Sequence, residues 1–405
     1  MSILEECKRR EVWEDFRDEK KKRDQLTKRE LKELDAFLYD ERYRNFTDLS
    51  SFPLPEKKTL MKRGSSKKRI VYTYPEEETW LLKLISHLLY RYDDKIPENC
   101  YSFRKHYTAK TAWDDIRKRK DIDQKYVLKL DIHDYFRSMD TEILYNLLKE
   151  IIDDDEELLS FFSLILNQDA CIEKGEVISE KRGAMPGVPV SSFFANVYLK
   201  DLDLYFLKQA IPYLRYSDDI LVFADSKDEI DAIYEYITAF LKEMKLTLNE
   251  EKYSLSLPGE PFEFLGFRYE KGEIDLSRVT VTKMKAKIRR KARSLYRKKT
   301  RKNLSYEKAA RELISHFDRV FYDIYGTGAF TWIRFYFPVI TTDEGLKEID
   351  ECMREYLRYL KSGRHYKGNY SVIYEKLKEL GYTPVLAEYY RWKKENRILN
   401  ELNQG

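Results

Sequence analysis

The sequence predicts an α+β protein in which a small antiparallel sheet lies among many helices. Two strand-like stretches that carry carboxylates predict the sheet: Tyr213–Ala224, which has the pattern of a β-hairpin, and the alternating run Tyr126–Ile132. The composition predicts the helices, because Gly (14) and Pro (11), which break helices, are few among 405 residues. This length is sufficient for two or three domains with a sizeable core.

Charge is unevenly distributed along the chain. The net charge is +4, with 42% hydrophobic and 36% charged residues, but acids cluster over Asp153–Glu157 and about a dozen Lys and Arg lie between Lys283 and Lys302. A basic tract in a chain with 32 Tyr and 21 Phe favours nucleic acid as the partner. The alternative is a solvated helix face.

The cysteines and the hydropathy indicate the compartment. Cys7, Cys100, Cys171 and Cys352 are scattered and form no CxxC or Cys/His pair, which argues against a zinc site or a disulfide framework and fits a reducing environment. No apolar run approaches the roughly 20 residues that span a bilayer, and the N-terminus lacks a signal-peptide apolar region. We therefore expect a cytoplasmic protein with no membrane partner.

The N-terminal region is predicted to be helical. From Glu5 to about Tyr43, apolar residues recur at helical spacing in a highly charged sequence, which predicts one or two amphipathic helices within an N-terminal extension over 1–50. A further helix is predicted over Glu76–Tyr92. Between them, Lys62–Arg69 is a basic Gly-Ser turn that could aim cations and N–H groups at phosphates, although such turns are also common on plain surfaces.

Two acidic centres follow. The alternation of Tyr126–Ile132 places Asp131 at the end of a strand, and the hairpin carries Asp218 and Asp219 at its tip. Adjacent carboxylates repel, and a divalent cation such as Mg²⁺ offsets that repulsion; an Asp pair that only forms a turn is the alternative. Two such ions about 4 Å apart would activate a 3′-hydroxyl and stabilise a leaving pyrophosphate. His133 has no ligand partner at useful spacing and is interpreted as structural.

A Gly/Pro-rich loop lies between the two acidic centres. Arg182–Pro189 runs directly into a predicted helix capped near Ser191. Glycine permits close approach by a base pair or sugar, and a helix N-terminus favours phosphate. A simple loop-to-helix joint is the alternative.

These pieces, in this order, resemble a reverse transcriptase of the bacterial group II intron-like kind over roughly residues 50 to 270. The motifs that carry the resemblance are Tyr216-Ser-Asp-Asp219, Leu130–Phe136, Pro189–Leu199, Leu246–Lys252, Phe264-Leu-Gly-Phe267 and Tyr101-Ser-Phe-Arg104. The resemblance implies a right-hand polymerase fold, with fingers over 51–125, a palm over 126–275 built on an antiparallel sheet with helices, and a helical thumb over 276–405.

The resemblance also implies roles for single residues. Asp131, Asp218 and Asp219 would be the catalytic carboxylates and, with the carbonyl of Ile132, the ligands of two Mg²⁺ ions, for which Mn²⁺ is a possible substitute. Phe136 would exclude a ribose 2′-hydroxyl. The remaining roles implied are Lys62 and Arg69 on the triphosphate, Gly187 beside the nascent base pair, Lys252 as a proton donor to pyrophosphate or simply an exposed lysine, and Arg104, Lys283, Lys287, Arg290 and Arg297 on nucleic acid.

One motif departs from the family pattern. The usual Pro-Gln-Gly is replaced by Met185-Pro186-Gly187, so Pro186 stands where a glutamine lies beside the base pair. Proline cannot make that amide contact and it stiffens the loop. This departure puts ordinary copying of long templates in doubt, but it leaves the metal chemistry in place.

We therefore expect an RNA-directed DNA polymerase that makes DNA from dNTPs on an RNA template. The N-terminal helices and the absence of a recognisable endonuclease or zinc-bearing tail make the chain more similar to defence-associated or abortive-infection enzymes, which use a dedicated non-coding RNA. The alternatives are a group II intron or retron-like mobile-element enzyme, an RNA-dependent RNA polymerase, template-independent or protein-primed DNA synthesis, and a non-catalytic RNA-binding protein.

Overall fold

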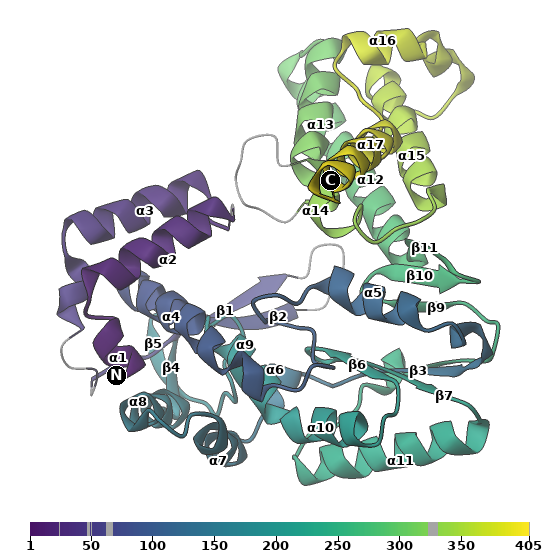
Figure 1. Ribbon diagram of the computed structural model, residues 1–405. Coiled ribbons are helices and arrows are strands. Elements are labelled where there is room, and N and C mark those ends of the chain that lie inside the picture. The colour runs from purple at the N-terminus through teal and green to yellow at the C-terminus, as the bar shows by residue number, and fades with distance from the viewer. Residues whose placement is uncertain (24, 47–48, 50, 62–67, 323–330, 405) are drawn as a thin grey trace. The chain divides into compact units, whose positions relative to one another are not determined.

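The computed structural model describes residues 1–23, 25–46, 49, 51–61, 68–322 and 331–404, with side chains described up to residue 397. The chain divides into two compact units, residues 1–260 and 261–405 (Figure 1). The first holds 44 Lys and Arg against 52 Asp and Glu, and the second 31 against 19, which gives net charges of −8 and +12. The modest overall charge therefore conceals an acidic and a basic unit.

A four-stranded antiparallel sheet forms the centre of the N-terminal unit. Its order is β6-β7-β3-β8, formed by β6 (Tyr213–Tyr216), β7 (Asp219–Ala224), β3 (Tyr126–Asp131) and β8 (Ser254–Ser256). The predicted hairpin and the predicted strand that ends at Asp131 are both confirmed. They are neighbours in this sheet because β7 pairs with β6 on one side and with β3 on the other.

Helices pack around this sheet. α10 (Lys200–Lys208) contacts β6, and α11 (Lys227–Glu243) contacts β3 and β7, so both lie along one face (Figure 1). α11 begins where Ser226 accepts a hydrogen bond from the Glu229 N–H, and it buries a helical stripe of isoleucine and leucine against the sheet. The helices between β3 and α10 are α6 (Tyr135–Ser138), α7 (Thr141–Ile151), α8 (Glu156–Leu166) and α9 (Ser191–Tyr198).

A second sheet has the order β2-β1-β4-β5. Its strands are β1 (Glu56–Met61), β2 (Lys68–Thr73), β4 (Ala170–Glu173) and β5 (Glu176–Ser179). β1 and β2 form an antiparallel hairpin, and β1 meets β4 in parallel where Glu56 pairs with Ile172. The predicted basic turn joins β1 to β2, but its residues 62–67 lie outside the described part of the chain.

The predicted N-terminal helices are present. The segment contains α1 (Ile3–Glu6), α2 (Arg10–Lys22), α3 (Lys28–Tyr39) and η1 (Arg42–Asn45), followed after β2 by α4 (Glu76–Leu88), η2 (Leu89–Lys95), α5 (Ala109–Lys118) and η3 (Ile122–Gln124). A capping box between Thr27 and Glu30 starts α3. Trp13 and Phe37 pack ring to ring between α2 and α3, so the extension has its own buried aromatic core.

The C-terminal unit combines a small sheet with long helices. The sheet has the order β11-β10-β9, and the elements are β9 (Phe262–Phe264), β10 (Phe267–Glu270), β11 (Glu273–Leu276), α12 (Arg278–Lys302), α13 (Tyr306–Phe321), α14 (Trp332–Phe335), α15 (Glu344–Ser362), η5 (Lys367–Ser371), α16 (Tyr374–Glu379) and α17 (Val385–Gln404). β9 and β10 lie before the expected palm–thumb boundary at 275 and β11 crosses it, and all three strands group with the C-terminal helices.

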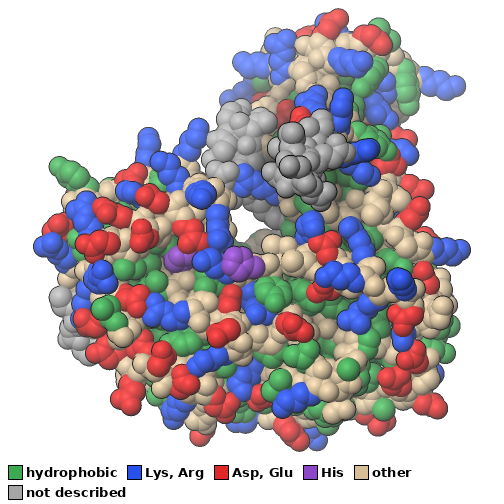
Figure 2. Space-filling model, in the orientation of Figure 1, with side chains coloured by type: hydrophobic (Ala, Val, Ile, Leu, Met, Phe, Trp, Pro, Cys, Tyr) green, Lys and Arg blue, Asp and Glu red, His purple; other side chains and the backbone are tan. Residues whose placement is uncertain are grey.

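The surface is mixed in charge. On the face drawn in Figure 2, Lys and Arg side chains intermingle with Asp and Glu over the body of the protein. Among the described residues, no helix is long and apolar enough to cross a membrane.

Candidate active site

The three predicted catalytic carboxylates meet at one end of the central sheet. Asp131 is the last residue of β3, and it pairs in register with Asp219, the first residue of β7. Asp218 lies in the β6–β7 turn beside them, where its carbonyl accepts a hydrogen bond of 3.2 Å from the Ile132 N–H. Ser217 enters this turn with a φ of 61°, a left-handed conformation that is uncommon for a residue other than glycine.

The carboxylates perturb one another electrostatically. Burial raises the pKa of Asp219 to about 6; Lys129 opposes the rise, and the charges of Asp218 and Asp131 add to it. Burial also raises the pKa of Asp218, followed in size by the negative charge of Asp131. The negative charge of Asp131 therefore disfavours the ionisation of both Asp218 and Asp219, as expected of carboxylates that share a site.

Asp131 has partners on the segment that follows α11. The ammonium group of Lys252, in η4 (Glu250–Lys252), contacts one carboxylate oxygen, and Asn249 Nδ2 donates to the other at 3.1 Å. Asn249 also donates its backbone N–H to the Asp131 carbonyl at 2.8 Å. Burial opposes the positive charge of Lys252, but the hydrogen bond and the charge of Asp131 outweigh it and raise the Lys252 pKa. The predicted lysine thus lies at the site, and Asn249 was not expected there.

The donor chemistry fits a hard divalent cation. Asp131, Asp218 and Asp219 offer carboxylate oxygens and Ile132 offers a carbonyl, the ligand types that Mg²⁺ prefers. The raised pKa values of Asp218 and Asp219 indicate that a neighbouring cation would favour the ionised form of these two carboxyl groups. Asp131 already has the ammonium group of Lys252 beside it. Within the described residues, no group of three or more His, Cys, Asp or Glu is already arranged around a common metal position.

An aromatic cluster lies beside the carboxylates. Phe136 of α6 is partly buried, and its ring centroid lies 6.4 Å from that of Phe103 in an edge contact. Phe103 in turn lies 6.5 Å from Tyr216, two residues before Asp218. Phe103 is 39% exposed with a φ of 55°, so its backbone adopts an unusual conformation to present the ring here. The sequence singled out its segment but not this residue.

The glycines of the Gly/Pro-rich loop lie where no side chain fits. A Cβ on Gly183 would lie 2.5 Å from the carbonyl oxygen of Phe136, to which Ala184 donates its N–H at 2.7 Å. A Cβ on Gly187 would lie 2.9 Å from the carbonyl oxygen of Tyr72 on β2. The loop therefore contacts both the segment carrying Phe136 and the β1–β2 hairpin at backbone distance.

Pro186 is bound to β2, and Ser191 does not cap the helix with its side chain as expected. Pro186 is buried, and its carbonyl accepts a hydrogen bond of 2.8 Å from the Tyr72 N–H. Ser191 is the first residue of α9 rather than a side-chain cap: its hydroxyl donates back to the Met185 carbonyl at 2.8 Å, and Val190 precedes the helix without a side-chain cap. The hydroxyl of Ser191 thus bonds to the preceding loop and does not accept from the free N–H groups of the first helical turn.

Arg104, which was predicted to contact nucleic acid, is instead bonded within the protein. Its guanidinium is buried and donates to the carbonyls of Pro97 (2.9 Å), Cys100 (3.2 Å) and Asp93 (2.7 Å), with Tyr107 stacked against it. The guanidinium of Arg104 is therefore hydrogen-bonded to backbone carbonyls of its own protein. In this structure Arg104 holds a loop together and does not present its charge to a ligand.

The predicted triphosphate cations are only partly described. Arg69 is exposed on β2, opposite Leu60 in the hairpin register. Lys62 lies outside the described residues.

The predicted cations of the C-terminal unit lie on one exposed stripe of α12. They are Lys283, Lys287, Arg290 and Arg297, at successive spacings of four, three and seven residues. The opposite stripe of the helix is buried. Other cations of α12 contact acids within the unit: Arg278 and Lys285 both contact Glu348. The stripe therefore places four exposed cations along one side of this helix.

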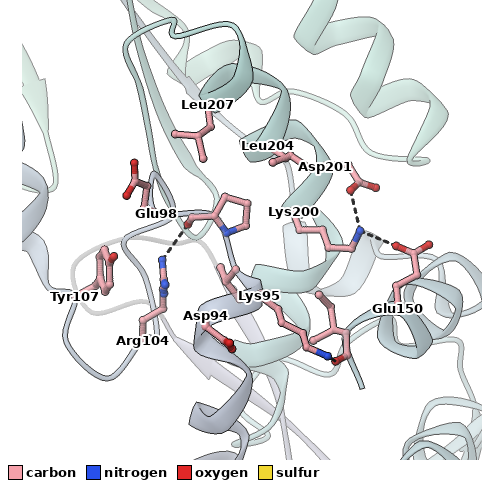
Figure 3. Close-up of a pocket in the computed structure, with 13 residues that line it drawn as sticks. Asp94, Lys95, Glu98, Arg104, Tyr107, Glu150, Lys200, Asp201, Leu204 and Leu207 are labelled. Carbon is pink, nitrogen blue, oxygen red and sulfur yellow. Dashed lines mark hydrogen bonds and ion pairs between the residues drawn. The ribbon is translucent and has the colours of Figure 1, made fainter. Parts of the chain in front are cut away.

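A cavity of about 580 Å³ in the N-terminal unit lies outside the carboxylate site. Its lysines are already paired: Figure 3 shows Lys200 in contact with Glu150 and Asp201. Lys95 donates to the Ile151 carbonyl and also contacts Asp153. Because these charges are mutually satisfied, the cavity offers no open cation to an anionic substrate, and we assign it no function.

Carboxylates at the end of an antiparallel sheet, with an aromatic ring and a glycine loop beside them, define the palm of a nucleotidyl-transferring polymerase. The family described as reverse transcriptase (RNA-dependent DNA polymerase) matches residues 57–269, which is more than half of the chain. The chain therefore belongs to the reverse transcriptase family, and its fold is the right-hand polymerase fold.

Solved structures give weaker likenesses. Apo telomerase from Candida tropicalis has a TM-score of 0.44 at 12% identity, covering 81% of this chain and 68% of that one; a form truncated from its C-terminal domain has a TM-score of 0.45 at 12% identity, covering 55% of each chain. Candida albicans telomerase, in complex with the TWJ fragment of telomeric RNA, has a TM-score of 0.44 at 14% identity, covering 82% and 65%. The chain thus spans about half to two thirds of these proteins. No curated protein matches it.

Proposed function

We propose that this protein is a Mg²⁺-dependent, RNA-directed DNA polymerase that copies a dedicated non-coding RNA from dNTPs in antiphage defence. The observation that carries the polymerase proposal is the register of β3 and β7, which sets Asp131 opposite Asp219 with Asp218 in the adjoining turn. Antiparallel pairing fixes this arrangement before any ligand binds, so the carboxylates are preorganised.

The chain's own residues supply binding and orientation. Bound divalent cations would activate the primer 3′-hydroxyl and stabilise the leaving pyrophosphate. Asp131, Asp218 and the Ile132 carbonyl would hold them, with Asp219 as a third nearby carboxylate. Lys252, whose ammonium group contacts Asp131, would give a proton to the departing group.

Selection of the sugar and binding of nucleic acid fall to other groups. The ring of Phe136 would fill the space of a ribose 2′-hydroxyl. Arg69, together with Lys62, would neutralise the triphosphate, and Gly187 would let the nascent base pair approach the loop backbone. The exposed stripe of α12 that begins at Lys283 would contact the template–primer backbone through its positive charges.

The defence role and the dedicated RNA rest on sequence resemblance, supported by the helical extension with its own core before β1. The experiment is purification with co-bound nucleic acid, then sequencing of the RNA and of any DNA made with dNTPs and Mg²⁺. We expect one discrete RNA and complementary DNA, abolished by Asp218→Ala. Asp231→Asn is the matched control, since it removes an exposed aspartate of α11 that pairs with Lys227.

Untemplated synthesis is a second candidate, and one observation favours it. Pro186 is buried and its carbonyl is bonded to β2, so the loop offers no side-chain amide to a template base at this position. DNA whose sequence bears no relation to the bound RNA would support this candidate and contradict the first.

A further inference from the structure

A fully buried arginine lies beneath the catalytic turn. Arg215 of β6 has no exposed surface, and neither has Asp203 of α10, with which it forms a two-point ion pair through Nε (2.8 Å) and Nη2. Nη1 donates to the carbonyls of Ala195 (3.3 Å) and Ser217 (3.2 Å), and Nη2 also reaches the carbonyl of Asn196 (3.2 Å). Every one of the five guanidinium N–H donors therefore has an oxygen acceptor.

The acceptors belong to three different elements. Ala195 and Asn196 lie in the last turn of α9, where helix carbonyls lack intrahelical partners and the dipole is negative. Asp203 belongs to α10, and Ser217 precedes the metal-site residue Asp218. One planar cation therefore joins the helix that follows the Gly/Pro-rich loop to the turn that carries the catalytic carboxylates.

The same turn is held from its other side. The Ser217 N–H donates to Ser102 Oγ at 2.9 Å, and Ser102 Oγ donates to Asn196 Oδ1 at 2.9 Å. Asn196 Nδ2 in turn donates to the Ser102 carbonyl at 2.7 Å, so that the two residues are joined by two hydrogen bonds. The N–H and the carbonyl of Ser217 are thus both fixed by buried groups, which is what a left-handed serine needs to persist.

We propose that the Arg215–Asp203 pair is a positioning device that holds the Ser217 turn in its left-handed conformation so that Asp218 and Asp219 face Asp131. This inference rests on the proposed polymerase function. A buried ion pair is a poor means of gaining stability, because desolvation offsets most of the attraction. The carbonyl of Ser217 is the one acceptor in the network that belongs to the catalytic turn, and reaching it requires the arginine fork.

The test is Arg215→Lys, which keeps the charge but offers three donors on a single nitrogen in place of the fork. We expect kcat to fall about 10- to 100-fold with the KM for dNTP little changed, and the half-saturating Mg²⁺ concentration to rise, as for a small misplacement of reacting groups. The matched control is Tyr213→Phe, which removes a buried 2.9 Å hydrogen bond to Asp203 but leaves the guanidinium contacts in place. We expect its kcat and Mg²⁺ dependence to be those of the wild type.

Hydrogen exchange of the peptide 213–224 gives a readout that needs no activity. We expect its amides to exchange faster in Arg215→Lys than in the wild type or in Tyr213→Phe. We also expect the two variants to have equal thermal midpoints, so that the faster exchange does not reflect a general loss of stability. Wild-type kcat in Arg215→Lys, or equal losses in both variants, would overturn the positioning role. If the wild type itself makes no DNA, the proposed function fails, and exchange at 213–224 alone decides whether Arg215 holds the turn.

Discussion

Asp131 and Asp219 lie directly opposite each other in the antiparallel register of β3 and β7. Like charges in such cross-strand positions destabilise a sheet. Lys252 at Asp131 and Lys129 near Asp219 reduce the repulsion, but the pKa of Asp219 is still raised to about 6, chiefly by burial. The ionised carboxylates at the proposed metal site therefore destabilise the metal-free fold.

The first prediction is that Asp219→Asn stabilises the metal-free protein while lowering its activity. A carboxyl with a raised folded pKa binds more protons in the folded state, so its ionisation costs stability as the pH rises through about 6. The gain, about 0.2–1 kcal/mol, should appear at pH 8 and vanish at pH 4. Thermal unfolding in a chelator measures it, with Asp231→Asn as the control. An equal gain at both pH values would contradict this account.

The second prediction concerns sugar selection. Phe136→Ala should lower the preference for dNTP over rNTP about tenfold or more, because the ring that would fill the ribose 2′ position is gone. Phe103→Ala, which removes only the neighbouring ring at 6.4 Å, should give a smaller change. Single-nucleotide incorporation with each substrate measures both. Unchanged selectivity in Phe136→Ala would remove its assigned role and favour an RNA polymerase.

The third prediction compares two glycines with positive φ. Gly187→Ala and Gly175→Ala share the backbone strain of φ values of 102° and 88°, which costs about 1–2 kcal/mol. Only the new methyl group at 187 lies 2.9 Å from the Tyr72 carbonyl, whereas Gly175 has no atom within 4 Å of its Cβ position. We therefore expect primer extension to fail in Gly187→Ala alone. Equal activity in the two variants would show that the loop can shift without consequence.

The fourth prediction is a pH dependence of stability. Burial, followed by the charge of Lys20, lowers the pKa of His87 to about 4, although Glu19 lies 3.3 Å from its ring and opposes the shift. Because the unfolded state is protonated near pH 6.5, stability is lost as the pH falls from 6.5 towards 4. Between pH 6.5 and pH 4, the free energy of unfolding of His87→Gln should fall less than that of the wild type, as measured by denaturant unfolding. His133→Gln, at an exposed site, should follow the wild type.

Local patterns predicted most of what lies close together in the sequence. The hairpin with its carboxylates and the strand that ends at Asp131 were each visible in a few residues, because alternation and turn residues determine them. Of the residues that the resemblance named, Lys252 contacts Asp131 and Phe136 lies in the aromatic cluster that includes Tyr216. The family match over 57–269 confirms the polymerase assignment.

Features that depend on distant partners were not predictable. The resemblance implied that Arg104 binds nucleic acid. Its three backbone carbonyl acceptors could not be foreseen, because an exposed and a buried arginine look the same in sequence. Asn249 was missed because its partner Asp131 lies more than a hundred residues away. Phe103 was missed because a left-handed phenylalanine leaves no compositional signal.

The opposite charges of the two units have a practical consequence for separating free from loaded protein. With net charges of −8 and +12, the two units of the free chain favour exchangers of opposite sign, although the total is only +4. Bound RNA would cover positive charge and add its own phosphates. The loaded form should therefore be retained by an anion exchanger and pass through a cation exchanger, so that two columns in series sort the molecules by occupancy.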